Sequence, residues 1–469
     1  MLGGHTRSAR HNAEAPRDAG SPERAIVVGA GVAGLAAGYR LRQAGFSVTV
    51  LEAEDHVGGR MSTVALDGYR IDTGASLLSS AYRQMVQLIE DAGLASSVEP
   101  TSSTFGVLRD GRVHRMSSDS AIDGVTTKLL SARAKASATK LLVDVIRSRA
   151  QLDYADLSKA ADLDTETLRD YAQRRVNPEV LDFLIEPITV GSFGIPSDQL
   201  SKVGFMFIIK NFIFGGSFFN SPTGIDFLPK GLARKLDTVL GARVTEIEET
   251  ANGVQVHWHA TATDTSHVEH AAAAVIAVPA PTMLEIYPQL DSTRREIAQS
   301  IEYCRSITVA LGLSRRPTET CAMLLIPPRE HPDVLAVFLE HNKAPGRAPA
   351  GKGLVSLDWQ GAWSDQRWEH DDETIAADTE TALRNALPGT LDDCNVELTH
   401  VTRWSHCLTR GQLGFYRNLK RFNDATDPHS PIQLAGDYLA LSSTGSSLCS
   451  GEQAADRLIS RARRDSRRG

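Results

Sequence analysis

Three glycines and one glutamate near the N-terminus have the types and spacing needed to bind a dinucleotide. Gly29, Gly31 and Gly34 form the pattern GxGxxG, and Glu52 follows 18 residues after Gly34. The first glycine allows a tight turn, the second lets the backbone approach a diphosphate, and the third allows a helix to pack closely on a strand. The diphosphate would lie at the positive end of the helix, and the carboxylate would accept hydrogen bonds from ribose hydroxyls.

A glycine pair and an arginine follow the glutamate too closely for a nicotinamide dehydrogenase. Gly58, Gly59 and Arg60 come six to eight residues after Glu52, where such an enzyme would continue into an ordinary crossover helix. The glycine pair lets the backbone lie flat against an extended dinucleotide, and the arginine can reach a phosphate or the substrate side. The stretch YRIDTGAS (69–76) predicts a short strand that brings its aspartate, threonine and glycine to the same area.

The elements that must position these residues come from separated parts of the chain. Residues 25–52 predict a strand, a glycine turn, a helix ended by Gly45 and a second strand, which is a βαβ unit. Residues 227–259 predict a helix, a short strand and a hairpin built on Asn-Gly. Residues 271–281 predict a buried strand that ends at a proline, and residues 431–458 predict a strand, a loop and a helix.

The length of 469 residues exceeds what one hydrophobic core usually supports, so two intermingled domains are expected. One domain binds the nucleotide, and the other, rich in helical pattern in its first part, binds the substrate. The nucleotide-binding domain is assigned residues 24–80, 225–290 and 405–460, the substrate-binding domain residues 81–224 and 291–404, a disordered lead-in residues 1–23 and a basic tail residues 461–469.

The composition is that of a soluble globular protein, with 42% hydrophobic residues, 23% charged residues and a net charge of -7. Nucleic-acid binding is not expected, because it normally needs a strongly basic face. The five scattered cysteines include no CxxC pair, which predicts neither a disulfide framework nor a zinc site and fits a cytoplasmic setting. No metal site is expected, because His257 and His259 lie on a hairpin strand with no third ligand nearby.

Two segments bear on membrane contact. The apolar run 203–219 is interrupted by Lys210 and Asn211, so it predicts no transmembrane helix and instead a cavity wall or a surface that touches lipid. The stretch 128–149 has six basic residues and only Asp144 as an acidic one, at helical spacing. A solvated helix face is the simpler interpretation of this stretch, and a membrane-surface or partner patch is the alternative.

The segments described above resemble those of the flavin-dependent amine oxidase superfamily, which includes monoamine oxidases, protoporphyrinogen oxidases and carotenoid desaturases. The matching pieces, in the family's order, are VVGAGVAGLAAGYRLRQAGFSVTVLEAEDHVGGR, IDTGAS, FLPKGLARKL, ARVTEI, AAVIAVPAP and AGDYLALSSTGSSLCSGEQAA. The resemblance implies an α/β fold with α+β inserts. A Rossmann-type FAD-binding domain would be combined with a discontinuous substrate-binding domain, as in amine oxidases and p-hydroxybenzoate hydroxylase.

The resemblance also implies non-covalent FAD. Val244 would place its backbone against the adenine, Gly436 and Asp437 would touch the pyrophosphate and ribitol, and Thr444 and Gly445 would begin a helix that points at the flavin N1–C2=O edge. A helix N-terminus suits that edge, since it offers about half a positive charge to an anionic reduced flavin. The residues expected to bind FAD are Gly29, Gly31, Ala33, Gly34, Glu52, Ala53, Gly58, Gly59, Arg60, Thr73, Gly74, Ala75, Ser76, Val244, Gly436, Asp437, Thr444, Gly445, Ser446 and Leu448.

The sequence departs from the superfamily where amine oxidases handle their substrate. The strand YCRSITVALGLS (303–314) has no lysine, Ser443 stands where an aromatic ring is common, and a proline usually found shortly after Trp404 is missing. These departures argue against a small primary amine. No catalytic side chain is assigned, and core packing explains the phenylalanines of the apolar run as well as a cavity wall does. The residues expected to contact the substrate are Phe207, Phe212, Phe214, Trp404 and Tyr416.

The resemblance implies an FAD-dependent oxidase that removes a hydride from an amine-type C–N unit of a hydrophobic substrate, with O2 as the electron acceptor and hydrogen peroxide as a product. Oxidation of a porphyrinogen, or desaturation of a polyene, is the alternative, and the lysine-free strand favours the porphyrinogen. A binding protein on the same fold without redox activity is a third possibility. The intact Glu52 and Gly58–Arg60 argue against it.

Overall fold

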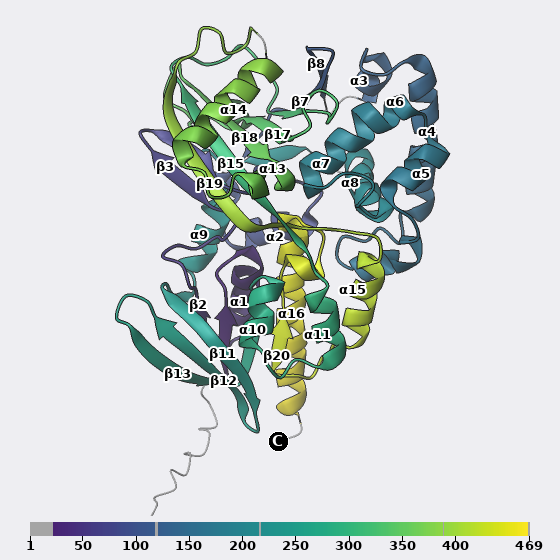
Figure 1. The fold of residues 1–469 in the computed structure, drawn as a ribbon. Coiled ribbons are helices and arrows are strands. Elements are labelled where there is room, and N and C mark those ends of the chain that lie inside the picture. The colour runs from purple at the N-terminus through teal and green to yellow at the C-terminus, as the bar shows by residue number, and fades with distance from the viewer. Residues whose placement is uncertain (1–21, 118–120, 215–216, 388, 468–469) are drawn as a thin grey trace, which may run out of the picture.

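The fold was analysed in a computed structural model (Figure 1). It describes residues 22–117, 121–214, 217–387 and 389–467. The disordered lead-in expected at residues 1–23 therefore lies almost wholly outside the described residues.

A five-stranded parallel sheet is built around the predicted βαβ unit, which is confirmed. The helix α1 (Val32–Gln43) joins two neighbouring strands and is followed by Gly45, whose φ of +96° suits only glycine. In spatial order the strands are β10 (Asp237–Val239), β2 (Ser47–Leu51), β1 (Arg24–Val28), β14 (Ala273–Ile276) and β20 (Ile432–Leu434). Strands from the beginning, middle and end of the chain thus lie side by side, as the separated sequence signals predicted.

Smaller elements complete this half of the molecule. The predicted Asn-Gly hairpin is confirmed and extends to a three-stranded sheet. These strands and the adjoining helices are β11 (Ala242–Thr250), β12 (Gly253–Ala260), β13 (Thr265–Ala271), α9 (Phe227–Ala233), α10 (Ala280–Ile286), α11 (Ser292–Gln299) and α15 (Phe415–Asp424). Two further small sheets are present. β3 (Thr63–Leu66) pairs with β4 (Tyr69–Asp72), and β9 (Phe218–Asn220) pairs with both β5 (Leu78–Ser79) and β6 (Glu99–Pro100).

A seven-stranded mixed sheet forms the other half. In spatial order its strands are β19 (Val396–Thr409), β15 (Tyr303–Leu313), β18 (Gly353–Trp359), β17 (Val334–Leu339), β16 (Met323–Leu325), β7 (Thr104–Arg109) and β8 (Arg112–Ser117). The helices α13 (Gly361–Gln366) and α14 (Asp372–Ala386) cover one face (Figure 1). Ile307 and Val309 of β15 pack into the core beneath these helices, so the side chains that alternate with them face the opposite way.

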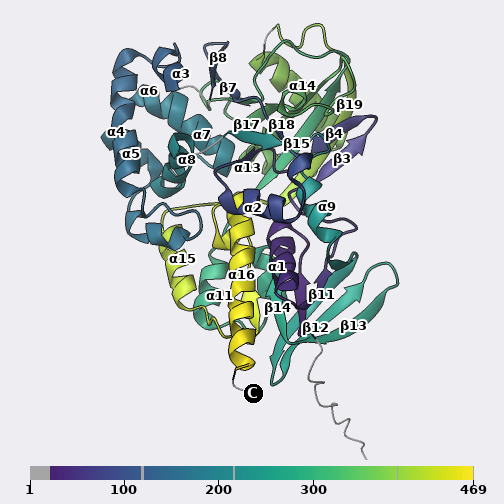
Figure 2. The same ribbon diagram turned by 180° about the vertical axis from the view of Figure 1, so that it is seen from behind.

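Most helices predicted between residues 81 and 224 gather beside the seven-stranded sheet, as both views show (Figures 1 and 2). They are α3 (Ala121–Thr126), α4 (Ala132–Ser148), α5 (Leu168–Arg175), α6 (Pro178–Val180), α7 (Glu186–Phe193) and α8 (Lys202–Phe214). The helix α2 (Arg83–Asp91) lies apart from them and packs in the same core cluster as α1 and α16. The apolar run forms α8, and its Phe205 and Phe207 are fully buried. Among the described residues, no helix is long and apolar enough to cross a membrane.

The last helix, α16 (Thr444–Asp465), packs directly on the first. A Cβ atom placed on Gly451 of α16 would lie 2.0 Å from the carbonyl oxygen of Ala33 in α1, so only glycine allows this approach. The helix reaches Asp465, so the first part of the basic tail expected at residues 461–469 is helical, and only its end follows the helix. The helices α1 and α16, far apart in the sequence, lie side by side in both views (Figures 1 and 2).

We expect Gly451→Ala to lower the free energy of unfolding by about 1–3 kcal/mol, because two backbones must move apart. Alanine is the better helix former by about 1 kcal/mol, so a loss would reflect the helix crossing and not helix propensity. Gly38→Ala in α1 is the matched control, since its Cβ would meet only flexible side-chain atoms at 3.2 Å or more. Urea unfolding of both variants measures the difference, and equal stabilities would contradict the close crossing.

Candidate functional site

The glycine turn after β1 has one glycine that the protein itself does not require. Gly29 has a φ of +98°, and a Cβ on it would lie 2.7 Å from the carbonyl oxygen of Ala277. A Cβ on Gly34 would lie 2.0 Å from the carbonyl oxygen of Gly29. Gly31, in contrast, has an ordinary φ of -70°, and a Cβ on it would meet no atom within 4 Å. The space beside Gly31 fits a ligand that approaches the backbone.

The N-terminus of α1 faces this space, and no side chain caps its backbone amides. The first turn of the helix contains no acidic residue. Free amide groups and the positive end of the helix dipole suit a diphosphate. The second glycine loop closes on the first, since the amide of Gly58 donates to the carbonyl of Ala30 (2.9 Å). A Cβ on Gly59 would meet only the Cα of Gly31, at 3.8 Å, so both loops line one space.

Glu52 holds the end of β2 against the first glycine loop. Its Oε2 accepts a hydrogen bond from the amide of Ala30 (2.6 Å), and its Oε1 accepts one from the amide of Glu54 (3.0 Å). Each oxygen can accept a further bond, as a ribose requires. The carbonyl of Glu52 accepts from Ala242 at the start of β11 (2.7 Å), which brings Val244 to the same end of the sheet. Ala53 is half-buried beside it.

Arg60 joins the second glycine loop to the C-terminal part of the chain. Its Nη1 donates to the carboxylate of Asp437 (2.6 Å) and to the carbonyls of His406 (3.1 Å) and Cys407 (2.9 Å). Burial lowers the pKa of Arg60, but the carboxylate of Asp437 outweighs it and the net shift is upward, so the guanidinium stays charged. The hydroxyl of Tyr303 also donates to Asp437 (3.1 Å). A contact of Arg60 or Asp437 with a cofactor stays a prediction.

The segment 73–76 lies directly against Arg60 and β19. The amide of Ala75 donates to the carbonyl of Arg60 (2.8 Å), and a Cβ on Gly74 would lie 2.4 Å from that carbonyl oxygen. The indole Nε1 of Trp404 donates to the carbonyl of Thr73 (2.6 Å). The structure therefore brings together the predicted residues of the first 76 positions, Trp404 and Asp437.

A buried group of charges, which the sequence analysis missed, fixes the start of this segment. Both oxygens of Asp72 accept hydrogen bonds from Arg347 (2.8 and 2.5 Å), and both side chains are fully buried. Burial raises the pKa of Asp72, but Arg347 and Lys343 outweigh it and the net shift is downward. Lys343 lies 2.8 Å from the carboxylate of Glu340 and donates to the carbonyl of Ser76 (3.1 Å). Because lysine and arginine are seldom buried, nothing in the sequence indicated that Lys343 and Arg347 lie in the interior.

The N-terminus of α16 is covered by tyrosines from distant segments. Ser443 caps the helix by accepting from the amide of Ser446 (3.2 Å), and the hydroxyl of Tyr154 hydrogen-bonds to Ser443 (2.6 Å). The ring of Tyr82 lies against Gly445, where a Cβ would be 2.5 Å from it. An aromatic ring thus reaches Ser443 from elsewhere in the chain, although position 443 itself is not aromatic.

The predicted substrate-binding residues fall into three groups. Trp404 lies at the segment 73–76, as described above. Phe207 and Tyr416 are fully buried in the core of the helical region, with ring centroids 6.2 Å apart. The side chains of Phe212 and Phe214 lie outside what the structure describes. Contact of any of these residues with a substrate stays a prediction.

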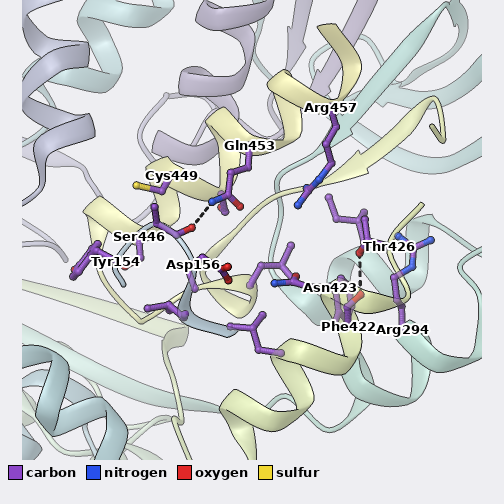
Figure 3. Close-up of a pocket in the computed structure, with 17 residues that line it drawn as sticks. Tyr154, Asp156, Arg294, Phe422, Asn423, Thr426, Ser446, Cys449, Gln453 and Arg457 are labelled. Atoms are coloured by element: carbon purple, nitrogen blue, oxygen red, sulfur yellow. Dashed lines mark hydrogen bonds between the residues drawn. The ribbon is translucent and has the colours of Figure 1, made fainter. Parts of the chain in front are cut away.

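Two of the residues expected to bind FAD also take part in packing where α1 and α16 cross. Ala33 contacts Gly451, and Leu448 is fully buried in the same core cluster. Ser446 is the only predicted residue that also lines a pocket on another side of α16, between that helix and α15, with an empty volume of about 550 Å³ (Figure 3). The polar side chains of this pocket include Asp156, Arg294 and Arg457. It is separate from the space beside Gly31.

Comparison with known proteins agrees with this geometry. The family model described as "Flavin containing amine oxidoreductase" matches residues 32–459. Protoporphyrinogen oxidase 2 of Arabidopsis thaliana is 33% identical over 39% of this chain, and that match spans 35% of its own length. Coproporphyrinogen III oxidase of Bacillus subtilis is 24% identical over 90% of this chain and 93% of its own. L-amino-acid oxidase of Demansia vestigiata is 26% identical over 90% of this chain and 83% of its own.

Solved structures show the same fold. Putrescine oxidase bound to putrescine superposes with a TM-score of 0.74 at 20% identity, covering 94% of this chain and 99% of that one. A putative protoporphyrinogen oxidase from Exiguobacterium gives a TM-score of 0.72 at 18% identity, covering 93% and 98%. The two-domain α/β architecture expected from the sequence is therefore confirmed. The chain belongs to the flavin-containing amine oxidoreductase family and is a flavin-dependent oxidoreductase.

Proposed function

We propose that this chain is an FAD-dependent oxidase that removes a hydride from a C–H bond next to nitrogen in a hydrophobic substrate, with O2 as the final acceptor and hydrogen peroxide as the product. The observation that carries the proposal is the space beside Gly31, bordered by the uncapped α1 and by Gly59. Glu52 would bind the adenosine ribose, and the second glycine loop leads through Arg60 to residues 73–76. Segments that adjoin in this order suit an extended dinucleotide such as FAD.

A bound flavin supplies the electron acceptor for the hydride, and the protein supplies position and electrostatics. The two glycine loops and Glu52 would hold the adenosine diphosphate. The α16 N-terminus, with Thr444 and Gly445, would place positive potential at the flavin ring. The backbone of residues 73–76, fixed by Trp404 and Lys343, would border the ring on the side of the seven-stranded sheet.

We propose that the cofactor is bound without a covalent link. Two cysteines are candidates for such a link, and burial raises the pKa of the Cys407 thiol well above its usual range and that of the Cys449 thiol to about 12. A thiol reacts mainly as its thiolate, so both side chains remain unreactive at neutral pH.

Oxidation of a porphyrinogen is the second candidate. The lysine-free strand β15 favours it, since Ser306, Thr308 and Ala310 occupy the face away from α14 and none of them is basic. The names of two relatives, a protoporphyrinogen oxidase and a coproporphyrinogen III oxidase, point the same way. In an amine the N–H nitrogen is bonded to the carbon that is oxidised, and in a porphyrinogen one pyrrole carbon separates the oxidised bridge carbon from an N–H nitrogen. Desaturation of a polyene is the third candidate and lacks that group.

Anaerobic mixing of the purified yellow protein with putrescine, N-methylbenzylamine, coproporphyrinogen III, protoporphyrinogen IX and phytoene distinguishes these candidates. We expect the visible flavin band to bleach with a nitrogen compound and to recover, with release of hydrogen peroxide, when air is admitted. Bleaching by phytoene alone would contradict oxidation next to nitrogen, and a protein that binds no flavin would contradict the whole proposal.

Gly31→Ala tests the cofactor site separately from the fold. Because the new methyl group meets no protein atom, we expect the free energy of unfolding of the flavin-free protein to change by less than about 1 kcal/mol. The methyl group enters the space proposed for the diphosphate, so the flavin content should fall at least about tenfold, as expected for about 1.4 kcal/mol. Gly29→Ala is the matched comparison and should damage both folding and flavin content. Full flavin content in Gly31→Ala would place the cofactor elsewhere.

We also propose peripheral contact with an anionic lipid surface through α4. Seven large apolar side chains are exposed among the described residues, and three of them, Leu142 (41%), Val143 (40%) and Ile146 (40%), lie within five positions of this helix. The exposed Lys140 and Arg147 border them. An apolar strip bordered by cations suits a negatively charged bilayer better than a neutral one.

Replacement of Leu142, Val143 and Ile146 by serine should reduce co-sedimentation with vesicles of phosphatidylglycerol and phosphatidylcholine at least about tenfold, because partly buried apolar area is lost. The matched control replaces Leu240 and Val268, exposed apolar residues of the other half, by serine and should leave binding unchanged. Equal binding of both variants, or no binding by the unaltered protein, would contradict lipid contact through α4.

A further inference from the structure

One carboxylate stands out on the face of the seven-stranded sheet that is turned away from α13 and α14. On β15, Ile307 and Val309 pack beneath those helices, so Thr308 between them faces the other way. Thr308 pairs across the strands with Asp358 of β18, and directly opposite residues share a face. The Thr308 hydroxyl donates to the Asp358 carboxylate (2.7 Å). Asp358 is the only residue of β18 that is not fully buried.

The fully buried Asp164 forms no ion pair but accepts hydrogen bonds from Ser201 and from several backbone amides. Asp358, which is only partly buried, also forms no ion pair within the described part of the chain and accepts a hydrogen bond from Thr308. The charged and titratable groups facing it are Lys343 and Glu340 of α12 (Glu340–Lys343) and Cys407 of β19. Lys343 is committed to Glu340 at 2.8 Å. Burial raises the pKa of Asp358 to about 6, Glu340 adds to this, and the hydrogen bond from Thr308 and the charge of Lys343 oppose it.

The neighbours of Asp358 are the groups that hold the proposed flavin-binding segments. Lys343 donates to the carbonyl of Ser76 (3.1 Å), and the carbonyl of Cys407 accepts from Arg60 (2.9 Å). Trp404, which donates to Thr73, lies on the same face of the sheet, since it pairs with Ser306, two residues before Thr308 on β15. The carboxylate of Asp358 therefore lies near the groups that hold residues 73–76 and Arg60, the segments proposed to border the flavin ring.

We propose that Asp358 accepts the N–H proton of the substrate and that Thr308 positions its carboxylate, an inference that rests on the proposed function and narrows its substrate class. In an amine, the C–H bond next to nitrogen would break and its electron pair would leave with the hydrogen as a hydride, for which a bound flavin would supply the acceptor. The N–H bond would break, its electron pair would form the C=N bond, and the proton would pass to Asp358. In a porphyrinogen, the hydride would leave the bridge carbon, the N–H electron pair would form a C=N bond within the pyrrole ring, the shifted ring electrons would form the C=C bond to the bridge carbon, and the proton would again pass to Asp358. The structure thereby favours an amine or a porphyrinogen over a polyene, which offers no N–H group.

The first test measures the protonation of Asp358 without using activity. A carboxyl that is harder to ionise when folded lowers stability as the pH rises from its unfolded pKa, about 4, to its folded pKa, about 6. The melting temperature of holo Asp358→Asn should therefore exceed that of the unaltered holoenzyme by an amount that grows from pH 4 to pH 6 and is constant above it. Asp365→Asn on α13, where Asp365 is half-exposed near Arg305, is the matched control and should show no such growth. Parallel curves for Asp358→Asn and the unaltered protein would overturn the assignment.

The second test follows flavin bleaching by the nitrogen compound of the panel that reduces the unaltered enzyme fastest. Asp358→Asn should slow bleaching about a hundredfold or more, as loss of a general base does. In the plot of bleaching rate against pH, the rising limb near pH 6 should also disappear. Thr308→Val should move that limb to higher pH, because the hydrogen bond that lowers the pKa is lost, and Thr308→Ser should restore it.

The outcomes separate this inference from the proposed function. Equal rates and identical pH limbs in Asp358→Asn and the unaltered enzyme would overturn the role of Asp358 and leave the flavin oxidase intact. If no nitrogen compound bleached the unaltered enzyme, the proposed function would fail, and the inference with it.

Discussion

The carboxylate of Asp72 has no access to water and accepts hydrogen bonds from three separated parts of the chain at once. It accepts hydrogen bonds from Arg347, from the hydroxyl of Thr63 and from the amide of Ile225. Arg347 in turn donates a hydrogen bond to the side-chain oxygen of Asn220. Breaking such a buried pair by removing one charge costs about 3–5 kcal/mol. The segment that borders the proposed flavin position begins at the next residue. Its course therefore depends on this ion pair more than on any property of its own sequence.

Most of the nucleotide-binding half could be predicted because its signals are local. The turn at Gly29, the helix end at Gly45 and the Asn-Gly hairpin each result from backbone geometry that few residue types allow, so a short stretch of sequence reveals them. The grouping of the separated segments in one domain followed from recognising a familiar arrangement of such stretches, whereas the order of the strands comes from the structure. Gly31 is the informative member of the set, since its conformation is ordinary and only an approaching ligand explains a glycine there.

The sheet face that carries the proposed chemistry could not be predicted, because its contacts join positions far apart. Lys343 and Ser76 are 267 residues apart, and Tyr154 and Ser443 are 289 apart. No periodicity or spacing links such pairs, and buried charges contradict the usual location of their residue types. The aromatic ring expected at position 443 illustrates this, since Tyr154 brings one to Ser443 from the helical region. Asp358 likewise looks unremarkable in sequence, as one acid in an otherwise apolar strand.

The contact between Gly451 and Ala33 joins positions near opposite ends of the chain. During synthesis the first glycine turn is made long before the helix that packs against it. Closing so long a loop is slow, and domains that depend on distant contacts fold late. The proposed flavin site can therefore be completed only after the segment of α16 has been made. Until then the nascent chain exposes apolar surface on α1, which makes chaperone supply and free cofactor concentration natural determinants of its yield in a cell.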